Sequence, residues 1–239
     1  MIESKFLCKK NDTSDLKEQF SSMLLELEEN RIKKQQFFSK SFAENQSVYA
    51  DFNVTKYVVF LKEGLCAVSE TDLSKKRIVI EILGDQEFLG LGRLFGASVS
   101  DDYQVMTKAK SEVIFIEKEY FLNYLSIRPS FSELLIQYVS QKICNLHSRV
   151  LSLTHYTRKK KVLHSLYNLS DSLSFRVGEY ALLPYEVTTK LLAEYSGVDL
   201  YFFNLVVNEL MDIQVLKYTS NGELAINIRK LEELFDEND

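Results

Sequence analysis

The sequence predicts an α+β protein in which an N-terminal antiparallel β-barrel or roll, a long helix and a C-terminal winged helix follow one another. Three observations predict this order. Short apolar runs separated by turn residues fill the chain from Phe42 to about Ile116, an apolar stripe of helical period follows Pro129, and a helix-turn-helix pattern with a hairpin comes last. We therefore expect domains at residues 1–128, 129–156 and 157–239.

The N-terminal part carries the pattern of a barrel. We expect a helix over Ser21–Phe38, a strand pair at Val54–Phe60 and Gly64–Val68, and further strands at Arg77–Leu83 and Glu112–Glu117. Five of the eight glycines lie between residues 42 and 116, where they can supply turns. These short strands and frequent turns favour a compact antiparallel barrel or roll.

The long helix carries a regular apolar stripe whose members alternate spacings of three and four residues, the a/d pattern of a two-stranded coiled coil. The stripe could instead pack on the chain's own barrel. We favour self-association, because Leu135 and Tyr138 form a second apolar set that can cover the barrel. The expected dimer seam is Ile136, Val139, Ile143, Leu146, Val150 and Leu153.

The C-terminal part fits a winged helix by the phase of its apolar residues. If Phe203, Val206, Val207 and Leu210 face the core, Leu192 and Ala193 of the preceding helix can pack beneath them, with Gly197 in the turn. The hairpin of the wing is expected over Lys217–Asn227, around Ser220, Asn221 and Gly222, since Asn-Gly supplies the positive dihedral angles of a tight turn. The same phase leaves the opposite face of the second helix exposed.

The charge of this helix-turn-helix differs from that of a typical DNA reader, because no Lys, Arg or His lies between Lys190 and Lys217. We predict DNA binding in which phosphates are held from outside the second helix, by Thr188, Thr189, Lys190, Lys217, Arg158, Lys159, Lys160 and Lys161. The second helix would present Asp199, Leu200, Tyr201, Asn204, Leu205 and Asn208. The alternative is a helix buried in a protein interface, with Leu200, Tyr201, Phe202 and Leu205 as an apolar patch.

Composition narrows the class of protein. At 239 residues, 46% hydrophobic and 26% charged, the chain is an ordinary globular sequence, and its net charge of -5 argues against a general nucleic-acid coat protein. Three scattered cysteines without a CxxC motif fit a reduced cytosol, and no segment is typical of a signal peptide or a membrane span. We expect a cytoplasmic protein without membrane contact.

No pattern of residues indicates catalysis. The three histidines, His147, His155 and His164, lack the spacing of a helical metal pair, and a phosphate-binding loop of Walker type is absent from the sequence. The GLG of the segment Gly84–Gly96 is not followed by the helix that a dinucleotide fingerprint requires. We expect no enzyme, no metal and no cofactor.

The order of these parts resembles the Crp/Fnr family of bacterial transcription regulators from about Leu24 to Ile228. The resemblance is carried by YVVFLKEGLCAV, RIVIEILGDQEFLGLGRLFG, SEVIFIEKEYFLNYLSIRPSF and TTKLLAEYSGVDLYFFNLVVNEL. It implies a cyclic-nucleotide-binding-like barrel, a dimerisation helix and a DNA-binding winged helix. It also implies a homodimeric transcription regulator, with double-stranded DNA and a second copy of the chain as partners and RNA polymerase as a further candidate.

The sequence departs from the family's pattern at the positions that bind the effector and at those that contact DNA bases. Leu91 and Gly92 stand where cyclic-nucleotide binders carry a glutamate, and Tyr103 and Gln104 stand where they carry Arg-Ser or Arg-Thr, so cyclic AMP is not expected. Neither an N-terminal cysteine group for an iron-sulfur cluster nor a barrel histidine for haem is present in the sequence. The second helix likewise lacks the family's usual base-contacting arginine.

Control of the protein is therefore predicted to rest on an unidentified small-molecule effector, or to be absent, leaving a constitutively active regulator. The expected effector pocket is Phe88, Leu89, Gly90, Leu91, Gly92, Arg93, Tyr103, Gln104, Tyr138 and Lys142. The alternative to a DNA-binding regulator is a relative that binds DNA weakly or not at all and uses its degenerate helix-turn-helix for protein contacts.

Overall fold

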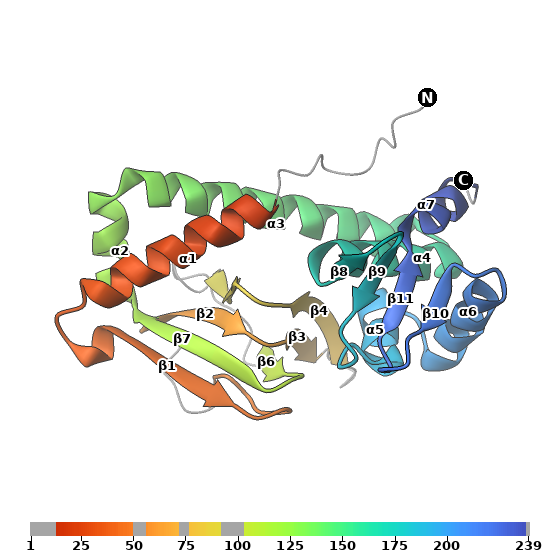
Figure 1. Ribbon diagram of the computed structural model, residues 1–239, viewed down its shortest axis with the longest axis horizontal. Helices are drawn as coiled ribbons and strands as arrows, with labels where there is room; N and C mark the ends of the chain where they lie inside the picture. Colours follow the sequence, from red (N-terminus) through yellow and green to blue (C-terminus); the bar gives the residue numbers. More distant parts are fainter. Residues whose placement is uncertain (1–12, 50–55, 72–76, 92–102, 238–239) are drawn as a thin grey trace.

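The computed structural model describes residues 13–49, 56–71, 77–91 and 103–237. A barrel of two sheets lies at one end, a winged helix lies at the other, and a long helix runs along both (Figure 1). The α+β fold class expected from the sequence is confirmed. Among the described helices, none is long and apolar enough to cross a membrane.

The barrel consists of two antiparallel sheets. The first has the strand order β1-β7-β2-β5, with bounds Phe37–Phe42, Ser111–Glu117, Tyr57–Glu63 and Glu87–Leu89. The second has the order β4-β3-β6, with bounds Arg77–Leu83, Cys66–Thr71 and Gln104–Thr107. Aromatic and β-branched residues fill these strands, and their inward side chains form the barrel core.

The expected pairing of the second and third strands is wrong, because β2 and β3 lie in different sheets. β2 pairs with β5 and β7, whereas β3 pairs with β4 and β6. Gly64 stands between them with φ +120° in close contact with Ser111, where an added Cβ would lie 2.3 Å from the hydroxyl oxygen. The chain therefore crosses between sheets at this glycine, and a tight hairpin does not form.

The N-terminal helix begins and ends earlier in the sequence than expected. α1 (Thr13–Glu29) packs on the barrel through Phe20, Met23 and Leu27, and a 3-10 turn, η1 (Lys34–Gln36), follows it. The helix expected over Ser21–Phe38 is therefore wrong at its end, because Phe37 and Phe38 begin β1 and pair with β7. Strand pairing overrides the local helical pattern there.

β4 is an edge strand of its sheet, and it contains a bulge. Val68 of β3 pairs with Glu81, but the next residue, Ser69, pairs with Val79, so Ile80 is the extra residue. Burial consequently departs from strict alternation: Val79 and Ile82 are buried, whereas Ile78 is 43% exposed. The free edge of β4 faces the helices of the C-terminal half, where it packs against α5.

The long helix α3 (Pro129–His155) follows α2 (Lys118–Ile127) and confirms the helix expected after Pro129. Proline fits its first turn because that turn has no partner for the missing N–H. Leu134, Leu135 and Tyr138 are buried against the barrel, and the Tyr138 ring packs edge-on against Phe20 and Phe88. Leu135 and Tyr138 therefore cover the barrel, as expected.

The winged helix contains a four-stranded sheet and four helices. Its sheet order is β10-β11-β9-β8, with bounds Leu216–Tyr218, Leu224–Asn227, Tyr180–Leu183 and Phe175–Val177. Its helices are α4 (Arg158–Ser172), α5 (Thr189–Ser196), α6 (Leu200–Asp212) and α7 (Ile228–Glu237). The expected hairpin is confirmed as β10 and β11, with Gly222 at φ +83° in its turn. The first hairpin, β8 and β9, had not been expected.

One apolar core joins the barrel and the winged helix. Leu65, Ala67, Val79 and Ile82 of the barrel belong to the same buried cluster as Val162, Leu166, Leu191, Leu192, Phe203, Val207 and Leu210 of the winged helix. A helix-turn-helix that only touched the barrel through a linker would leave these residues in separate cores. The two parts are therefore docked.

Candidate nucleic-acid interface

The turn between α5 and α6 is fixed by caps that its sequence supplies. The Thr188 hydroxyl accepts a hydrogen bond from the Leu191 N–H at 3.3 Å and begins α5, and the Asp199 carboxylate accepts one from the Phe202 N–H at 2.8 Å and begins α6. Between them Gly197 ends α5 with φ +70°. An added Cβ at Gly197 would lie 2.9 Å from Leu153, so the turn also rests on α3.

α6 has one buried and one exposed face, as the phase of its apolar residues predicts. Phe203, Val206, Val207 and Leu210 are buried, which confirms the expected core face. Leu200, Tyr201 and Leu205 are 43%, 75% and 49% exposed. Asn204 and Asn208 lie on the same exposed face. A ligand of α6 would therefore meet amide, phenol and apolar groups.

The basic run expected to hold phosphates forms the first turn of α4, and much of its charge is already engaged. Arg158 forms an ion pair with Asp199 and lies 4.1 Å above the Phe202 ring, while Lys159 Nζ is 2.5 Å from a carboxylate oxygen of Glu209. The backbone N–H of Phe202 and then Arg158 lower the pKa of Asp199. Asp199 is thus a helix cap in an ion pair, and its expected base contact stays a prediction.

The expectation that Lys160 contacts a phosphate is wrong, because the residue is buried. Its side chain is 6% exposed, with Nζ 5.1 Å from the Tyr156 ring centre and 4.7 Å from that of Phe235. Burial of the residue beneath these rings removes it from any surface that DNA could reach. Lys161 is half-buried on the same helix and stays a prediction.

The remaining expected phosphate contacts lie on two sides of the winged helix. Lys217 is exposed on β10, with Nζ 3.7 Å from the Tyr180 ring centre. Thr188 and Lys190 lie at the start of α5, where both are exposed, and line a hollow of about 270 Å³ whose other wall belongs to the barrel. Thr189 is half-buried beside them. The α5 group therefore borders the barrel and is open to solvent.

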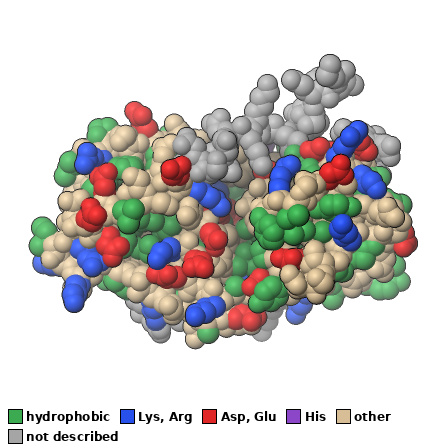
Figure 2. Space-filling view, viewed as in Figure 1, with side chains coloured by type: hydrophobic (Ala, Val, Ile, Leu, Met, Phe, Trp, Pro, Cys, Tyr) green, Lys and Arg blue, Asp and Glu red, His purple; other side chains and the backbone are tan. Residues whose placement is uncertain are grey.

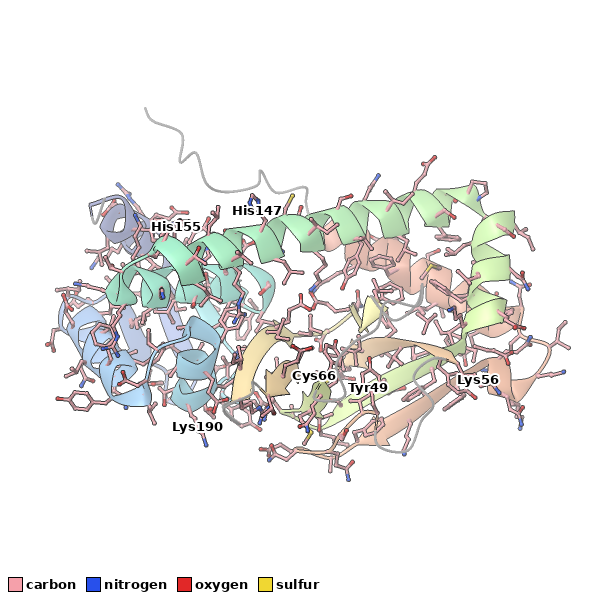
Figure 3. The ribbon with its side chains drawn as sticks, turned by 180° about the vertical axis from the view of Figure 1, so that it is seen from behind. Tyr49, Lys56, Cys66, His147, His155 and Lys190 are labelled. Atoms are coloured by element: carbon pink, nitrogen blue, oxygen red, sulfur yellow. The ribbon has the colours of Figure 1, made fainter. Side chains whose placement is uncertain are left out.

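The expected dimer seam is exposed along much of α3. Ile136, Ile143, Leu146 and Val150 are 64%, 61%, 38% and 56% exposed. Val139 is half-buried against the barrel core, and Leu153 is half-buried against the α5–α6 turn. His147 and His155 also lie on the outer side of α3 (Figure 3). Exposed apolar side chains at heptad spacing match one face of a helix pair.

Exposed hydrophobic side chains also occur in the winged helix outside α6. On the face shown in Figure 2, hydrophobic side chains gather over the winged helix, whereas charged side chains are frequent over the barrel. The large hydrophobic residues exposed in the winged helix are Phe175, Val177, Tyr185, Leu200, Tyr201, Leu205, Ile213 and Tyr218. Two of them, Phe175 and Val177, lie on the edge strand β8.

A cavity of about 140 Å³, lined by both apolar and charged side chains, lies where the barrel, α1, α3, α4 and α5 meet. It is lined by Tyr138 and Lys142 of the expected effector pocket, together with Phe20, Glu81, Glu87, Asn168 and Tyr195. Phe88 packs in the aromatic cluster beside the cavity. Six described residues of the expected pocket do not line the cavity: Phe88, Leu89, Gly90, Leu91, Tyr103 and Gln104. Gly92 and Arg93 lie outside the described residues.

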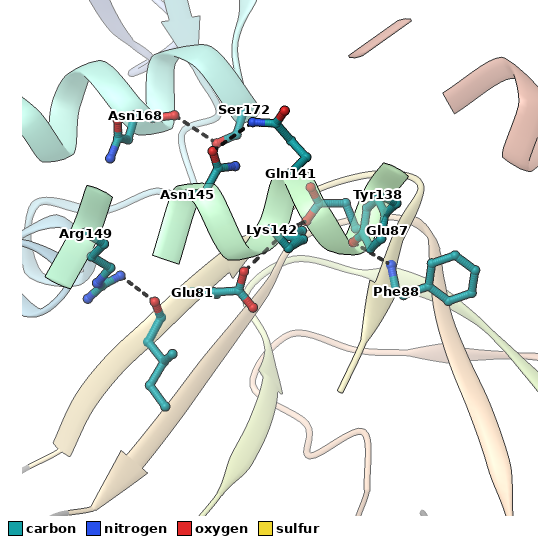
Figure 4. A network of polar contacts seen from close by, with 11 residues as sticks. Glu81, Glu87, Phe88, Tyr138, Gln141, Lys142, Asn145, Arg149, Asn168 and Ser172 are labelled. Atoms are coloured by element: carbon teal, nitrogen blue, oxygen red, sulfur yellow. Dashed lines mark hydrogen bonds and ion pairs between the residues drawn. The ribbon is translucent and has the colours of Figure 1, made fainter. Parts of the chain in front are cut away.

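Lys142 is the charged centre of this cavity (Figure 4). Its Nζ lies 3.1 Å from a carboxylate oxygen of Glu87 and 3.4 Å from one of Glu81, so it joins α3 to β5 and β4. Burial alone would lower the pKa of Lys142, but the charges of Glu87, Tyr138 and Glu81 raise it, and the side chain stays protonated. The Tyr138 hydroxyl accepts a hydrogen bond from the Phe88 N–H at 3.2 Å.

Arg149 was not among the site residues expected from the sequence. It is 8% exposed and donates to the carbonyl oxygens of Val79, Ile80 and Tyr195, so one side chain of α3 binds both β4 and α5. A signal was present in the sequence, because Lys142 and Arg149 follow Leu135 at intervals of seven residues. That spacing puts both cations on the helix face assigned to the barrel.

Comparisons with known proteins support the family resemblance. Residues 39–128 match the cyclic nucleotide-binding domain family. A cyclic nucleotide-binding domain containing protein from Listeria monocytogenes EGD-e is 19% identical, with 89% of this chain and 99% of that chain covered and a TM-score of 0.76. A mutant of CooA from Carboxydothermus hydrogenoformans is 14% identical, with coverages of 89% and 95% and a TM-score of 0.69.

A transcriptional regulator of the CRP/FNR family from Thermus thermophilus is 17% identical, with 84% of this chain and 100% of that chain covered and a TM-score of 0.64. No curated protein matches the sequence significantly. At these identities the structural likeness shows the fold, and it extends over the barrel, the long helix and the winged helix together.

Proposed function

Because the chain shares the fold of the Crp/Fnr transcription regulators and carries their type of barrel domain, we propose that it is a DNA-binding transcription regulator that acts as a homodimer. The observation that carries this proposal is the exposed face of α6. In a helix-turn-helix the second helix enters the major groove, and here its exposed face carries two amides and a phenol above a fully packed core.

Base contacts would come from short polar and apolar groups. Asn204 and Asn208 are four residues apart on one helix face, and an asparagine amide can pair with both the N6 and N7 atoms of adenine. Tyr201 can bind a phosphate, and Leu200 and Leu205 can contact thymine methyl groups. Such a surface favours A·T-containing sites over the G contacts that arginine makes.

Phosphate contacts would be few, because α6 itself carries no cation. Lys217 of the wing is exposed, and Lys190 with Thr188 lies at the start of α5. Each phosphate neutralised contributes a slope of about −0.9 to the dependence of log affinity on log salt. We therefore expect a shallower salt dependence than for a regulator with an arginine-rich recognition helix.

Dimerisation would use the exposed stripe of α3. Ile136, Ile143 and Val150 are seven residues apart and Leu146 lies between them, so two copies of α3 can pack these side chains against one another. A two-fold axis along the paired helices would set two α6 helices for half-sites about 34–36 Å apart. The site read by the dimer would then be palindromic.

Control by a small molecule, where it occurs, would act at the cavity beside Tyr138 and Lys142. Its lining comes from the barrel side and from α4 and α5, so a ligand bound there differs in affinity between docked and undocked winged helices. The outer part of the expected pocket, Phe88–Arg93 with Tyr103 and Gln104, stays a prediction. A constitutively active regulator would need no such ligand.

A second function is favoured by the same face of α6. Leu200, Tyr201 and Leu205 are apolar enough to bind a protein, with RNA polymerase among the candidates, and Glu209 and Asp212 add negative charge that repels DNA. Salt separates the two functions, since phosphate contacts weaken as salt rises and an apolar protein contact does not.

The test is selection of bound duplexes from a random DNA library by the purified protein at two salt concentrations, with its oligomeric state measured alongside. Enrichment of a palindromic site by a dimer supports the proposal. An Ile143→Asp variant should be monomeric and should bind half-sites only weakly, because a charge at the seam cannot be buried. Failure to enrich any sequence at the lower salt concentration would favour the protein-contact function.

A further inference from the structure

We propose that the cavity of about 140 Å³ where the barrel meets α3, α4 and α5 binds a small organic cation, namely a protonated amine carried on one ring or on a short apolar chain. The inference rests on the proposed function, which places an effector at this cavity, and it names the chemical class of that effector. Three properties of the cavity point to this class: its charge, its walls and its size.

The ion-paired side chains of the cavity carry more negative than positive charge (Figure 4). Lys142 Nζ is within 3.4 Å of a carboxylate oxygen of both Glu87 and Glu81, and the side chains of Lys142, Glu87 and Glu81 are 22%, 14% and 29% exposed. Two carboxylates therefore share one ammonium group. The other charged residues of the lining, Lys17 and Asp171, have opposite charges and leave this balance unchanged.

The excess negative charge is unfavourable at this depth. Burial raises the pKa of Glu87, because the carboxylate loses hydration there, and the charge of Lys142 opposes this effect only in part. The charge of Glu81 raises the pKa of Glu87 further. A cationic ligand would supply the missing positive charge, whereas a ligand with a carboxylate or a phosphate would add to the repulsion.

The two carboxylates also have hydrogen-bonding capacity left. Within the described part of the chain, Lys142 is the only group that donates to the side chains of Glu81 and Glu87. Two ionised carboxylates offer about eight acceptor positions, whereas one ammonium group has about three donors. A protonated amine in the cavity would bring further N–H donors to these acceptors, and such charge-assisted hydrogen bonds are strong.

Aromatic side chains form an apolar part of the wall, which suits the body of such an amine. Phe20, Tyr138 and Tyr195 line the cavity, and the rings of Phe20 and Tyr138 meet edge-on with their centres 5.3 Å apart. Lys142 Nζ lies 5.6 Å from the centre of the Tyr138 ring, so this ring already contacts one cation. Amide side chains add neutral polar groups to the lining: Gln86, Gln141, Asn145 and Asn168.

The size of the cavity limits the ligand to one ring or a short chain. Its volume is about 140 Å³, and a protein cavity of about 150 Å³ accommodates benzene. A cyclic nucleotide joins a base, a ribose and a phosphate, so it is too large for this volume and has the wrong charge. The cavity therefore fits a ligand of a different class.

A ligand in the cavity would contact several elements at once. Glu87 belongs to β5, Lys142 to α3, Asn168 to α4 and Tyr195 to α5, and all four line the cavity. Binding should therefore stabilise the arrangement in which the barrel and the winged helix are docked, and it should raise the melting temperature as the ligand concentration rises.

The experiment measures the binding of three probes of similar shape to the whole chain in the absence of DNA. Benzylamine is a cation, benzyl alcohol is neutral and benzoate is an anion, so charge is the main difference between them. Isothermal titration calorimetry gives each affinity, and thermal melting checks it. Hydrogen exchange of residues 81–87 and 138–145 tests whether the bound probe lies at the cavity.

Two matched variants assign the binding to the excess carboxylate. Glu87→Gln removes one negative charge and leaves the ion pair of Lys142 with Glu81, so the fold should be retained. Glu112→Gln is the control, because Glu112 pairs with Lys62 at 3.1 Å on β7 and does not line the cavity. If Glu87→Gln does not fold, Glu81→Gln takes its place.

The expected result is saturable binding of benzylamine, about tenfold or more tightly than benzyl alcohol, with no binding of benzoate. Glu87→Gln should weaken the binding of benzylamine about tenfold, and Glu112→Gln should leave it unchanged. Benzylamine should raise the melting temperature of the wild-type chain and should slow exchange over residues 81–87 and 138–145.

Four results would overturn the inference: no binding of benzylamine at millimolar concentrations, equal or tighter binding of benzyl alcohol or benzoate, equal affinity of wild type and Glu87→Gln for benzylamine, or protection outside the cavity only. None of them bears on DNA binding, which the selection experiment tests separately. Amine binding by a chain that enriches no duplex would contradict the proposed function and leave the ligand class intact.

Discussion

The two helices of the helix-turn-helix differ in how much of their surface is buried. α5 is enclosed between the core of the winged helix and the β4 edge of the barrel, and Leu191, Leu192 and Ala193 are all buried. α6 is covered on one side only, and its other side exposes Tyr201 and its neighbours to solvent. The comparison teaches that the orientation of the motif is fixed through α5, whereas contact with a macromolecule is left to α6.

The largest effect should come from matched leucines on the two helices. Leu192 of α5 is 1% exposed and Leu205 of α6 is 49% exposed. Leu192→Ala should lower the free energy of unfolding by about 2–5 kcal/mol, because it removes buried methyl groups and leaves a cavity. Leu205→Ala should change it by no more than about 0.5 kcal/mol. Urea denaturation measures both, and similar losses in the two variants would remove the distinction between the helices.

Lowering the pH should lower the free energy of unfolding through the buried His164. Burial, and then the charge of Arg149, lower the pKa of His164 to about 4 from 6.5. The unfolded chain therefore takes up a proton as pH falls below 6.5, whereas the folded chain resists until about pH 4. The stability present above pH 6.5 should fall by about 3 kcal/mol across this interval.

The pH prediction has its own control. His164→Gln should flatten the dependence of unfolding free energy on pH between 6.5 and 4, measured by urea denaturation at each pH. An equally steep dependence in His164→Gln and wild type would mean that His164 is not the group responsible.

Removal of the amides of α6 should affect DNA binding without affecting the fold. Asn204→Ala or Asn208→Ala should each weaken binding to a selected site by about 1–3 kcal/mol, the range of one bidentate base contact, with little change on random duplexes. Fluorescence anisotropy on both duplexes measures this difference. Asn123→Ala, at an exposed position of α2, is the control. Equal weakening on both duplexes would show that the amides do not read bases.

The smallest effect is expected at the ion pair between the start of α4 and the start of α6. Arg158 and Asp199 are 55% and 59% exposed, so solvent screens their attraction. Arg158→Gln should change the free energy of unfolding by about 0.5 kcal/mol or less in a urea titration. A loss several times larger would mean that the start of α4 contributes to the position of α6 far more than its exposure suggests.

Much of this comparison could be predicted from the sequence, because it depends on local periodicity. The apolar residues of α6 recur at helical spacing, so Phe203 and Val207 were placed in the core and Tyr201 outside it correctly. Gly197 and Gly222 were likewise found from the conformations that turns require. The long helix was evident from its stripe and from Pro129.

What failed depends on contacts between distant segments. The basic run was expected to hold phosphates because four cations are adjacent, but Tyr156 and Phe235 bury Lys160, while Asp199 and Glu209 form ion pairs with its neighbours Arg158 and Lys159. The acceptors of Arg149 are backbone carbonyls, which leave no trace in residue identity. The crossing of the chain at Gly64 depends on its close packing against Ser111, 47 residues further along the chain.

The most direct test is hydrogen exchange, followed by mass spectrometry, of the whole chain with and without a duplex obtained by selection. The account predicts that residues 200–208 become protected on DNA. Unchanged exchange over residues 200–208 would contradict the assignment of α6 as the DNA-contacting helix.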